Sequence, residues 1–407
     1  MKLGYPIARR FSSYTSVNFK DSKKAYQLLD NKSLKRQRNI YSMFKVFSKN
    51  ERVGQSIITK FMDFKPPIIY PYIQNMLFDQ FCGGEDIESV KPLMKKIAGK
   101  RISPMLNYGV ENSMLESDLD SCKDEMINMI DTLKVQPELI RGKAVLKVTG
   151  IISYKRLKKI QDAIILNNKE RREWKKDILR LEEVCEHATT NNVKLIFDAE
   201  TNDVQRIIHS LSLQMMRKHN KQLPNIYGTI QFYRKDSHQQ LDNLIKESQA
   251  WGYVPGVKLV RGAYIYDEIL ANNRELLHDT KEDTDVSYNT AVTKCLQNIN
   301  NMAVCFAGHN MESVQHILRE MHRFSIPDYC ENITLAQMLG MRNDITFNLE
   351  GVNVSQFISY GKKKHLVSFL VRRGIENSSS LSGANDELEL TLKEIKRRRS
   401  ESFKSLM

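Results

Sequence analysis

The sequence predicts an α/β fold, a distorted (βα)₈ TIM barrel with a helical N-terminal region and a C-terminal helical extension. From about residue 143 onward, short runs rich in Val, Ile, Leu and aromatic residues alternate with longer, charged helical patterns. Such alternation favours a parallel sheet whose strands are connected by helices. Eight strand segments match a closed barrel better than an open doubly wound sheet, and no GxGxxG motif follows the first of them.

The eight strand candidates are short and apolar, and most end on polar residues. We expect strands at 144–149, 193–198, 226–233, 257–264, 303–308, 333–339, 345–349 and 356–360. Helical periodicity fills most of the gaps, at 154–190, 204–219, 237–251, 286–299 and 311–324. The gap between the sixth and seventh candidates is short for a regular helix.

Four regions follow from these patterns. We expect a mitochondrial transit segment at 1–20, a helical N-terminal region at 21–142, the barrel at 143–381 and a C-terminal helical extension at 382–407. The first twenty residues contain four basic residues and no acidic one, which is typical of a transit peptide, although a disordered basic tail has the same composition. The C-terminal extension is amphipathic, and its Leu388, Leu390, Leu392 and Ile395 are expected to pack on the barrel.

Composition narrows the function classes. The chain carries a formal net charge of +14, but its basic residues are spread over many segments, with no RNA-binding motif or helix-turn-helix spacing. We therefore expect no nucleic-acid partner. No segment is apolar enough to predict a membrane span. The six cysteines form no CxxC pair and no zinc-ligand spacing, so we expect reduced, structural cysteines and no metal.

Two adjacent arginines near the C-terminus suggest an anion receptor. Arg372 and Arg373 lie in an apolar helical run, where guanidinium groups need a partner. We expect Arg372 to meet Glu376, four residues later, and Arg373 to remain available for a carboxylate or phosphate. A solvated helix end with basic residues in its last turn is the alternative.

Polar residues also collect where the predicted strands end. They are Lys147, Asp198, Glu200, Gln231, Lys258, Arg261, His309, Asn310, Gln337 and Tyr360. In a barrel of this kind the carboxyl ends of the strands form the active site. Any one of them, such as His309, could be a satisfied structural group, but their convergence on one rim favours a binding site.

Five motifs together resemble the proline dehydrogenase (proline oxidase) family, in its mitochondrial, fungal-like form. They are Lys258-Leu-Val-Arg-Gly-Ala-Tyr264, Gly308-His-Asn310, Gln337-Met-Leu-Gly-Met341, Tyr360-Gly361 and Arg372-Arg-Gly-Ile-Glu-Asn377. They occur in the family's order, and the resemblance runs from about residue 143 to the C-terminus. It implies a barrel that holds FAD at the carboxyl ends of its strands.

The resemblance also implies roles for individual residues. The cofactor-binding residues would be Gln231, Lys258, Val260, Gly262, Ala263, Tyr264, His309 and Asn310, with Lys258 near flavin N5. Among the catalytic residues, Arg372 and Arg373 would clamp the proline carboxylate with help from Lys147. Tyr360 would pack on the substrate ring. Asp198 would hold the polar network in place, and Glu376 would brace an arginine. Many members have arginine at the position of Lys258 and a small hydroxyl residue at that of Gly308.

The implied reaction is oxidation of L-proline to Δ1-pyrroline-5-carboxylate by hydride transfer from C5 to flavin N5, the first step of proline catabolism. Electrons would pass to ubiquinone, from an enzyme peripherally associated with the matrix side of the inner mitochondrial membrane. The alternatives are a 4-hydroxyproline dehydrogenase, which could use the same clamp, and a non-catalytic barrel that binds amino acid or membrane.

Overall fold

The computed structural model describes residues 17–47, 67, 69–113, 115–135, 140–349, 351–379 and 381–404. Nearly all of the expected transit segment lies outside these residues. The chain divides into two compact units, which are described separately. The described residues of the first lie within Ser103–Ala336 and Gly351–Ser355, and those of the second within Ser16–Ile102, Gln337–Glu350 and Gln356–Met407.

Eight parallel strands form a closed barrel, which confirms the predicted fold class. The strands are β2 (Ser103–Tyr108), β3 (Lys143–Leu146), β4 (Lys194–Phe197), β5 (Ile226–Gln231), β6 (Gly256–Val260), β7 (Ala303–Ala307), β8 (Ile333–Met338) and β9 (Val354–Tyr360). They are hydrogen-bonded in chain order, and β9 pairs with both β8 and β2. Within the first unit, the Leu335 amide donates to the Asn353 carbonyl at 3.0 Å, and Ser103 Oγ donates to the Val354 carbonyl at 3.1 Å.

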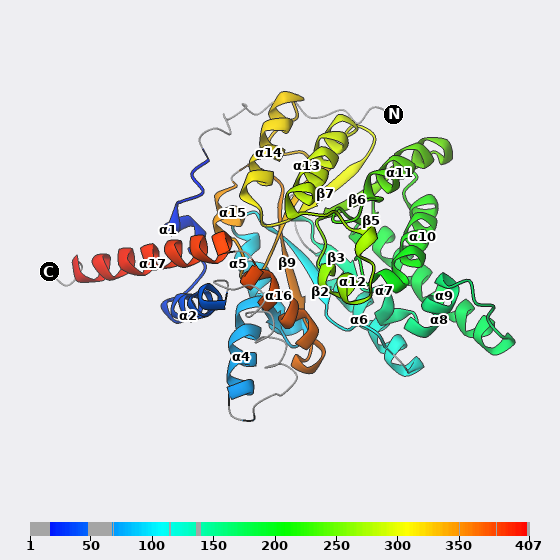
Figure 1. Cartoon of the computed structure of the whole chain (residues 1–407), viewed down its shortest axis with the longest axis horizontal. Coiled ribbons are helices and arrows are strands. Elements are labelled where there is room, and N and C mark those ends of the chain that lie inside the picture. Colours follow the sequence, from blue (N-terminus) through cyan, green and yellow to red (C-terminus); the bar gives the residue numbers. More distant parts are fainter. Residues whose placement is uncertain are drawn as a thin grey trace. The chain divides into compact units, whose positions relative to one another are not determined.

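Helices cover the outside of these strands in the first unit (Figure 1). They are α6 (Glu116–Lys134), α7 (Val148–Ile151), α8 (Tyr154–Gln161), α9 (Asn168–Thr190), α10 (Asn202–His219), α11 (Ser237–Trp251), α12 (Ile265–Leu270), η3 (Arg274–Leu276), α13 (Lys281–Gln297) and α14 (Met311–Arg323). The strand side chains facing them are apolar and buried, as the continuous hydrophobic runs of β3 to β8 require in a parallel sheet covered on both faces.

The second unit is mainly helical. It contains α1 (Ser22–Ala25), α2 (Asn31–Phe47), α4 (Ile69–Phe81), α5 (Ile87–Ala98), α15 (Asn343–Asn348), η4 (Lys363–His365), α16 (Val367–Ser379) and α17 (Leu381–Lys404). A short strand, β1 (Cys82–Gly84), pairs in parallel with the end of β9. No described helix is long and apolar enough to cross a membrane.

One predicted strand is wrong and one strand was missed. Residues 345–349 do not form a strand, because Asn343–Asn348 is the helix α15. Its apolar and polar residues alternate as they would in a strand. All six residues are buried, so the sequence shows no exposed polar face that would indicate a helix. The missing strand is β2, where Pro104 and the polar Ser103 and Asn107 obscured an otherwise buried run. The short sixth gap is thereby explained, since α15 connects β8 to β9.

The expected helix at 154–190 is two helices. Ala163, two residues after the end of α8, adopts a left-handed backbone conformation with φ of +56°. Asn167 then starts α9 with a capping box, in which its side chain accepts from the Glu170 amide and the Glu170 side chain accepts from the Asn167 amide. Residues 162–167 therefore form a defined connection between two capped helix ends.

Candidate active site

Two lysines and an aspartate meet inside the first unit at the carboxyl ends of the strands. Asp198 follows β4, and its two oxygens lie 2.9 Å from Lys147 Nζ and 2.7 Å from Lys258 Nζ. Burial alone would raise the pKa of Asp198, but the two ammonium groups hold it far below its usual range. The aspartate is therefore a fixed negative charge between two cations.

Lys147 has further partners on neighbouring elements. Its Nζ lies 3.1 Å from Glu111 Oε1, after β2, and 3.0 Å from the Tyr264 hydroxyl, after β6. Burial opposes its charge, yet Asp198 and Glu111 raise its pKa well above the ordinary lysine value. Lys147, Asp198, Lys258 and Tyr264, four of the predicted site residues, thus form one network.

Glu200 is a buried carboxylic group beside this network. Its oxygens accept hydrogen bonds from the Thr149 amide, at 3.1 Å, and from the Thr149 hydroxyl. Burial, together with the negative charge of Glu111, raises its pKa to about 7, although Lys147 acts in the opposite direction. Glu200 can therefore change protonation near neutral pH.

Gln231, at the end of β5, has a buried amide that needs a partner. Neither its Oε1 nor its Nε2 has a hydrogen-bond partner among the described residues. Strand register pairs Thr229 with Lys258, and Gln231 lies two residues beyond Thr229, so the Gln231 and Lys258 side chains share the inner face of the barrel. Because an unpaired buried amide is costly, this donor and acceptor fit a polar ligand at the strand ends.

The connection after β6 contains four predicted cofactor-binding residues: Val260, Gly262, Ala263 and Tyr264. Gly262 has φ of +129°, and a Cβ there would lie 1.7 Å from the Tyr233 ring. The position therefore requires glycine for backbone and packing reasons, independently of any cofactor. Tyr264 is buried, whereas Val260 and Ala263 are half-buried.

His309 and Asn310 follow β7, and both are half-buried. The Asn310 side chain accepts from the Ser313 amide at 3.0 Å, so it caps α14. Nearby, Arg261 pairs with Asp285 and lies over the Tyr288 ring, and a Cβ at Gly308 would come within 3.3 Å of its guanidinium. The closeness of Arg261 therefore explains a glycine at position 308 without reference to a cofactor.

The remaining predicted residues, Tyr360, Arg372, Arg373 and Glu376, belong to the second unit. Arg373 is buried, and its Nη2 lies 2.7 Å from Glu376 Oε1. Arg373 was expected to remain available for a ligand, but it forms an ion pair with Glu376, its i,i+3 neighbour on α16. Burial raises the pKa of Glu376 despite both arginines, and the fully buried Tyr360 ends β9.

Three charged side chains near the site are not predictable from the sequence alone. Glu111 follows β2, a strand whose pattern the sequence does not reveal. Glu200 stands at a predicted strand end without a signal for its role, and Asp285 lies within α13, where nothing in the sequence separates it from surface carboxylates. Within the described residues no cluster of three or more His, Cys, Asp or Glu could hold a metal ion, and all six cysteines are buried and lie outside disulfide bonds.

Comparison with known proteins identifies the family. The sequence model of the proline dehydrogenase family matches residues 90–386. This chain belongs to the proline dehydrogenase family. Its members are oxidoreductases, so the chain is an enzyme of that class.

Relatives from several kingdoms match most of the chain. Mitochondrial proline dehydrogenase 2 of Arabidopsis thaliana is 28% identical over 378 residues, which cover 81% of this chain and 79% of the relative. A hydroxyproline dehydrogenase of Xenopus laevis is 26% identical, with 80% and 78% covered. The similar proteins therefore include both a proline dehydrogenase and a hydroxyproline dehydrogenase.

Solved structures show the same fold. Proline utilization A of Bdellovibrio bacteriovorus superposes with a TM-score of 0.73 at 19% identity, covering 89% of this chain. This chain spans only 42% of that protein, and at this identity the likeness concerns the fold alone.

Proposed function

We propose that this enzyme oxidises L-proline to Δ1-pyrroline-5-carboxylate with FAD as its cofactor. The observation that carries the proposal is the buried, unpaired Gln231 amide beside the Lys147–Asp198–Lys258 network at the strand ends. The edge of a flavin ring presents both donors and acceptors, which is what an amide with two unsatisfied atoms requires. The residues present therefore fit the cofactor that the family implies.

FAD would be held by residues of the first unit. Gln231 would bind the ring edge and Lys258 would lie near N5, while the connection from Val260 to Tyr264 would line the ring, and His309 and Asn310 would contact the cofactor beyond it. When bound, FAD supplies the acceptor, at N5, for the hydride that leaves C5 of proline. Asp198 would keep the Lys258 ammonium in place during this step.

Proline would be held mainly by its carboxylate. Arg372 and Arg373 offer planar guanidinium groups suited to bidentate contacts, and Lys147 adds a further cation. Glu376 would fix the orientation of Arg373, to which it is ion-paired at 2.7 Å. Tyr360 would pack on the pyrrolidine ring. The amine nitrogen gives up a proton and C5 gives up a hydride, so the product carries a C=N bond and two electrons leave the substrate.

The electrons would pass to ubiquinone, which takes them up with two protons to become the quinol. We propose that the enzyme is mitochondrial and associates peripherally with the matrix side of the inner membrane. Several relatives are named as mitochondrial proteins, and the formal charge of +14 favours an anionic lipid surface.

4-Hydroxyproline is the second candidate substrate, because a Xenopus laevis relative is named hydroxyproline dehydrogenase. Both substrates carry the same carboxylate and amine, so the arginines do not distinguish them. A buried Tyr360 favours the unsubstituted ring, since an added hydroxyl would need both space and a hydrogen-bond partner.

A visible spectrum of the purified protein before and after anaerobic addition of L-proline tests this function. We expect a flavin spectrum that bleaches with proline and bleaches much more slowly with 4-hydroxyproline. Bleaching only with 4-hydroxyproline would show that this second candidate is the substrate. A protein that neither contains FAD nor takes it up would contradict the proposal.

A further inference from the structure

The connection between α8 and α9 exposes two isoleucines at its tip. Ile164 is 51% exposed and Ile165 is 82% exposed. An exposed apolar patch that polar residues surround can mark a site of protein or membrane interaction. We call these two residues the Ile164–Ile165 tip.

The tip is displayed by a firmly held backbone. After Ala163, the Ile164 amide donates to the Lys159 carbonyl at 2.8 Å, which closes the end of α8, and Arg171 Nε donates to the Leu166 carbonyl at 3.0 Å. The capping box of Asn167 fixes the start of α9. The isoleucines are therefore held outward by local hydrogen bonds.

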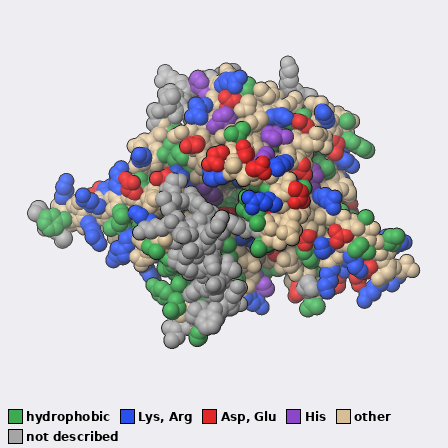
Figure 2. Space-filling view, viewed as in Figure 1, with side chains coloured by type: hydrophobic (Ala, Val, Ile, Leu, Met, Phe, Trp, Pro, Cys, Tyr) green, Lys and Arg blue, Asp and Glu red, His purple; other side chains and the backbone are tan. Residues whose placement is uncertain are grey.

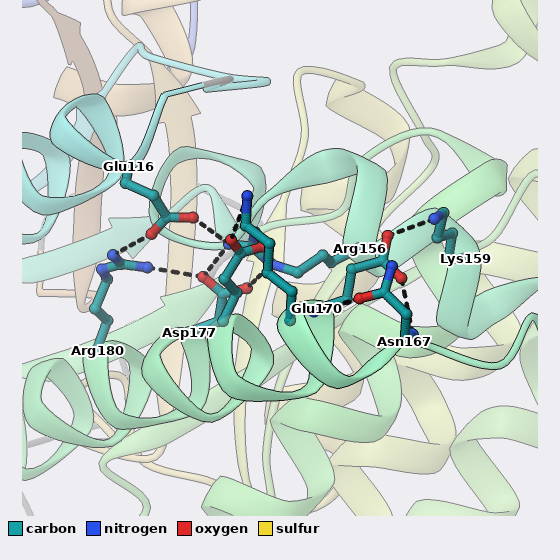
Figure 3. Close-up of polar contacts among 9 residues, drawn as sticks. Glu116, Arg156, Lys159, Asn167, Glu170, Asp177 and Arg180 are labelled. Carbon is teal, nitrogen blue, oxygen red and sulfur yellow. Dashed lines mark hydrogen bonds and ion pairs between the residues drawn. The ribbon is translucent and has the colours of Figure 1, made fainter.

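A buried ion-pair network fixes the two helices behind the tip (Figure 3). Asp177 of α9 is fully buried and accepts from Arg156 of α8, at 2.5 Å from Nε, and from Arg180, at 2.7 Å from Nη1. Glu116 of α6 bridges the same two arginines at 2.8 and 2.6 Å. The α8–α9 pair is thereby anchored to α6.

Basic side chains surround the tip. From Lys155 to Lys176 the chain carries nine lysines and arginines against three acidic residues, a net charge of +6. Among the described residues no carboxylate pairs with the exposed Lys155, Arg172, Lys175 or Lys176. Figure 2 shows Lys and Arg side chains beside hydrophobic ones on the projection at the lower right, which α8 and α9 form in Figure 1.

The exposed face of α9 continues this surface. Arg172, Lys175, Lys176 and Leu179 recur at helical spacing, so they share one face, and Leu179 is also exposed. The face combines cations with an apolar side chain, as the tip does.

The tip lies toward the same end of the barrel as the candidate active site. At the end of α8, Gln161 Nε2 donates to the Asn202 carbonyl at 2.6 Å, and Gln161 Oε1 accepts from the Arg206 amide at 2.9 Å. Asn202 begins α10, four residues after Asp198. The end of α8 is thus fixed to the rim that carries Asp198.

We propose that the Ile164–Ile165 tip and the cations around it dock on an anionic lipid bilayer. Two isoleucines can enter the boundary between headgroups and acyl chains, while Lys155, Arg172, Lys175 and Lys176 contact lipid phosphates. Two side chains offer far less area than the roughly 800 Å² per partner of a stable protein interface, whereas unpaired cations complement anionic headgroups. This docking rests on the proposed quinone-linked function, because it would bring the strand-end rim toward the quinone.

Vesicle cosedimentation of the full chain tests the docking directly. The probes are phosphatidylcholine vesicles with and without the anionic lipid cardiolipin. We expect binding only with cardiolipin, and weaker binding at high salt. Since each cation near such a surface contributes about fivefold to affinity, Lys175→Gln/Lys176→Gln should weaken binding about tenfold or more. Ile164→Ser/Ile165→Ser should weaken it by at least about tenfold.

Matched variants control for general effects of charge and exposure. Lys95→Gln/Lys96→Gln removes two adjacent exposed lysines from α5, and Val286→Ser removes an exposed aliphatic side chain from α13. Both should bind vesicles like the unmodified chain. Equal loss in the lysine pairs would show diffuse attraction of the whole protein, and unchanged binding of the tip variant would also overturn the proposal. Self-association that the tip variant abolishes, without vesicle binding, would assign the surface to a second copy.

Activity separates this inference from the proposed function. The tip variants should reduce a water-soluble dye with proline as fast as the unmodified chain, but should reduce ubiquinone in cardiolipin vesicles more slowly. Vesicle binding that depends on the tip, in a protein that does not oxidise proline, would leave the docking intact and contradict the function. Proline oxidation without tip-dependent vesicle binding would support the function and contradict the docking.

Discussion

Asp198 shows how one residue organises the candidate site. Two ammonium groups within 3 Å of a single carboxylate would repel one another in a buried setting without it. Each carboxylate oxygen contacts one of the two lysines, so Asp198 fixes the positions of both. An isolated charged lysine at either position would be costly to bury, so the three groups are best understood as one unit.

Glu200 makes stability depend on pH. Its folded pKa of about 7 exceeds the ordinary glutamate value, so the folded state binds a proton that the unfolded state has already lost. The stability that this proton provides is complete below about pH 4 and is lost as pH rises to about 7. We expect the free energy of unfolding to fall by up to about 3 kcal/mol across this window on account of Glu200.

Glu200→Gln tests this dependence, because an amide keeps the size of the side chain and never ionises. Urea unfolding at several pH values between 5 and 8 should show a shallower fall for the variant than for the unmodified chain. Asp236→Asn, at a half-exposed position paired with Arg234, serves as the control and should leave the slope unchanged. Parallel pH profiles for Glu200→Gln and the unmodified chain would contradict the raised pKa.

At the level of elements, the sequence predicts most of the barrel but not all of it. Hydrophobic runs identify β3 to β9, with polar ends where the site lies, because buried parallel strands have few other compositions. They miss β2, since Pro104 and two polar residues interrupt its pattern, and they mistake α15 for a strand. A fully buried helix of six residues has no polar face from which a helical period can be read.

The same limits apply to the site. Residues at recognised strand ends, such as Lys147 and Asp198, could be predicted, whereas Glu111 could not, because its strand was not recognised. Spacing alone predicted that Arg373 stays free of Glu376, whereas the structure joins the two in an ion pair. On a helix both i,i+3 and i,i+4 neighbours are within reach, so side-chain rotamers and packing decide between them.

The ion-pair network of α6, α8 and α9 should be sensitive to loss of its central carboxylate. Asp177→Ala leaves Arg156 and Arg180, both nearly buried, without the group that lies between them. Glu116 still pairs with both arginines in this variant, but their charge-assisted hydrogen bonds to Asp177 are lost, so we expect a loss of about 1.5–3 kcal/mol in the free energy of unfolding, measured in urea. Glu183→Ala removes an exposed ion pair with Lys123 and should cost less than about 1 kcal/mol. Similar losses in both variants would mean that the network contributes no more than a surface pair.

At the scale of the whole chain, the second unit joins segments from opposite ends of the sequence. The helix α17 packs against α1 and α2, with Leu390 in a cluster of Ala25, Tyr26 and Leu34. Tyr26 donates to Glu387 at 2.9 Å, across 361 residues of sequence. The C-terminal helix thus packs on the N-terminal helices of its own unit, and of its four predicted packing residues Leu392 is instead 47% exposed.

Leu390 and Leu392 provide a matched test of this long-range packing, because they lie two residues apart on the same helix. Leu390→Ala should lower the free energy of unfolding by about 2–4 kcal/mol, since it empties a buried position, whereas Leu392→Ala should cost less than about 1 kcal/mol. Hydrogen exchange should also become faster in α1 and α2 for Leu390→Ala, although these helices are more than 340 residues away in sequence. Equal costs, or faster exchange confined to α17, would show that the C-terminal helix does not stabilise the N-terminal ones.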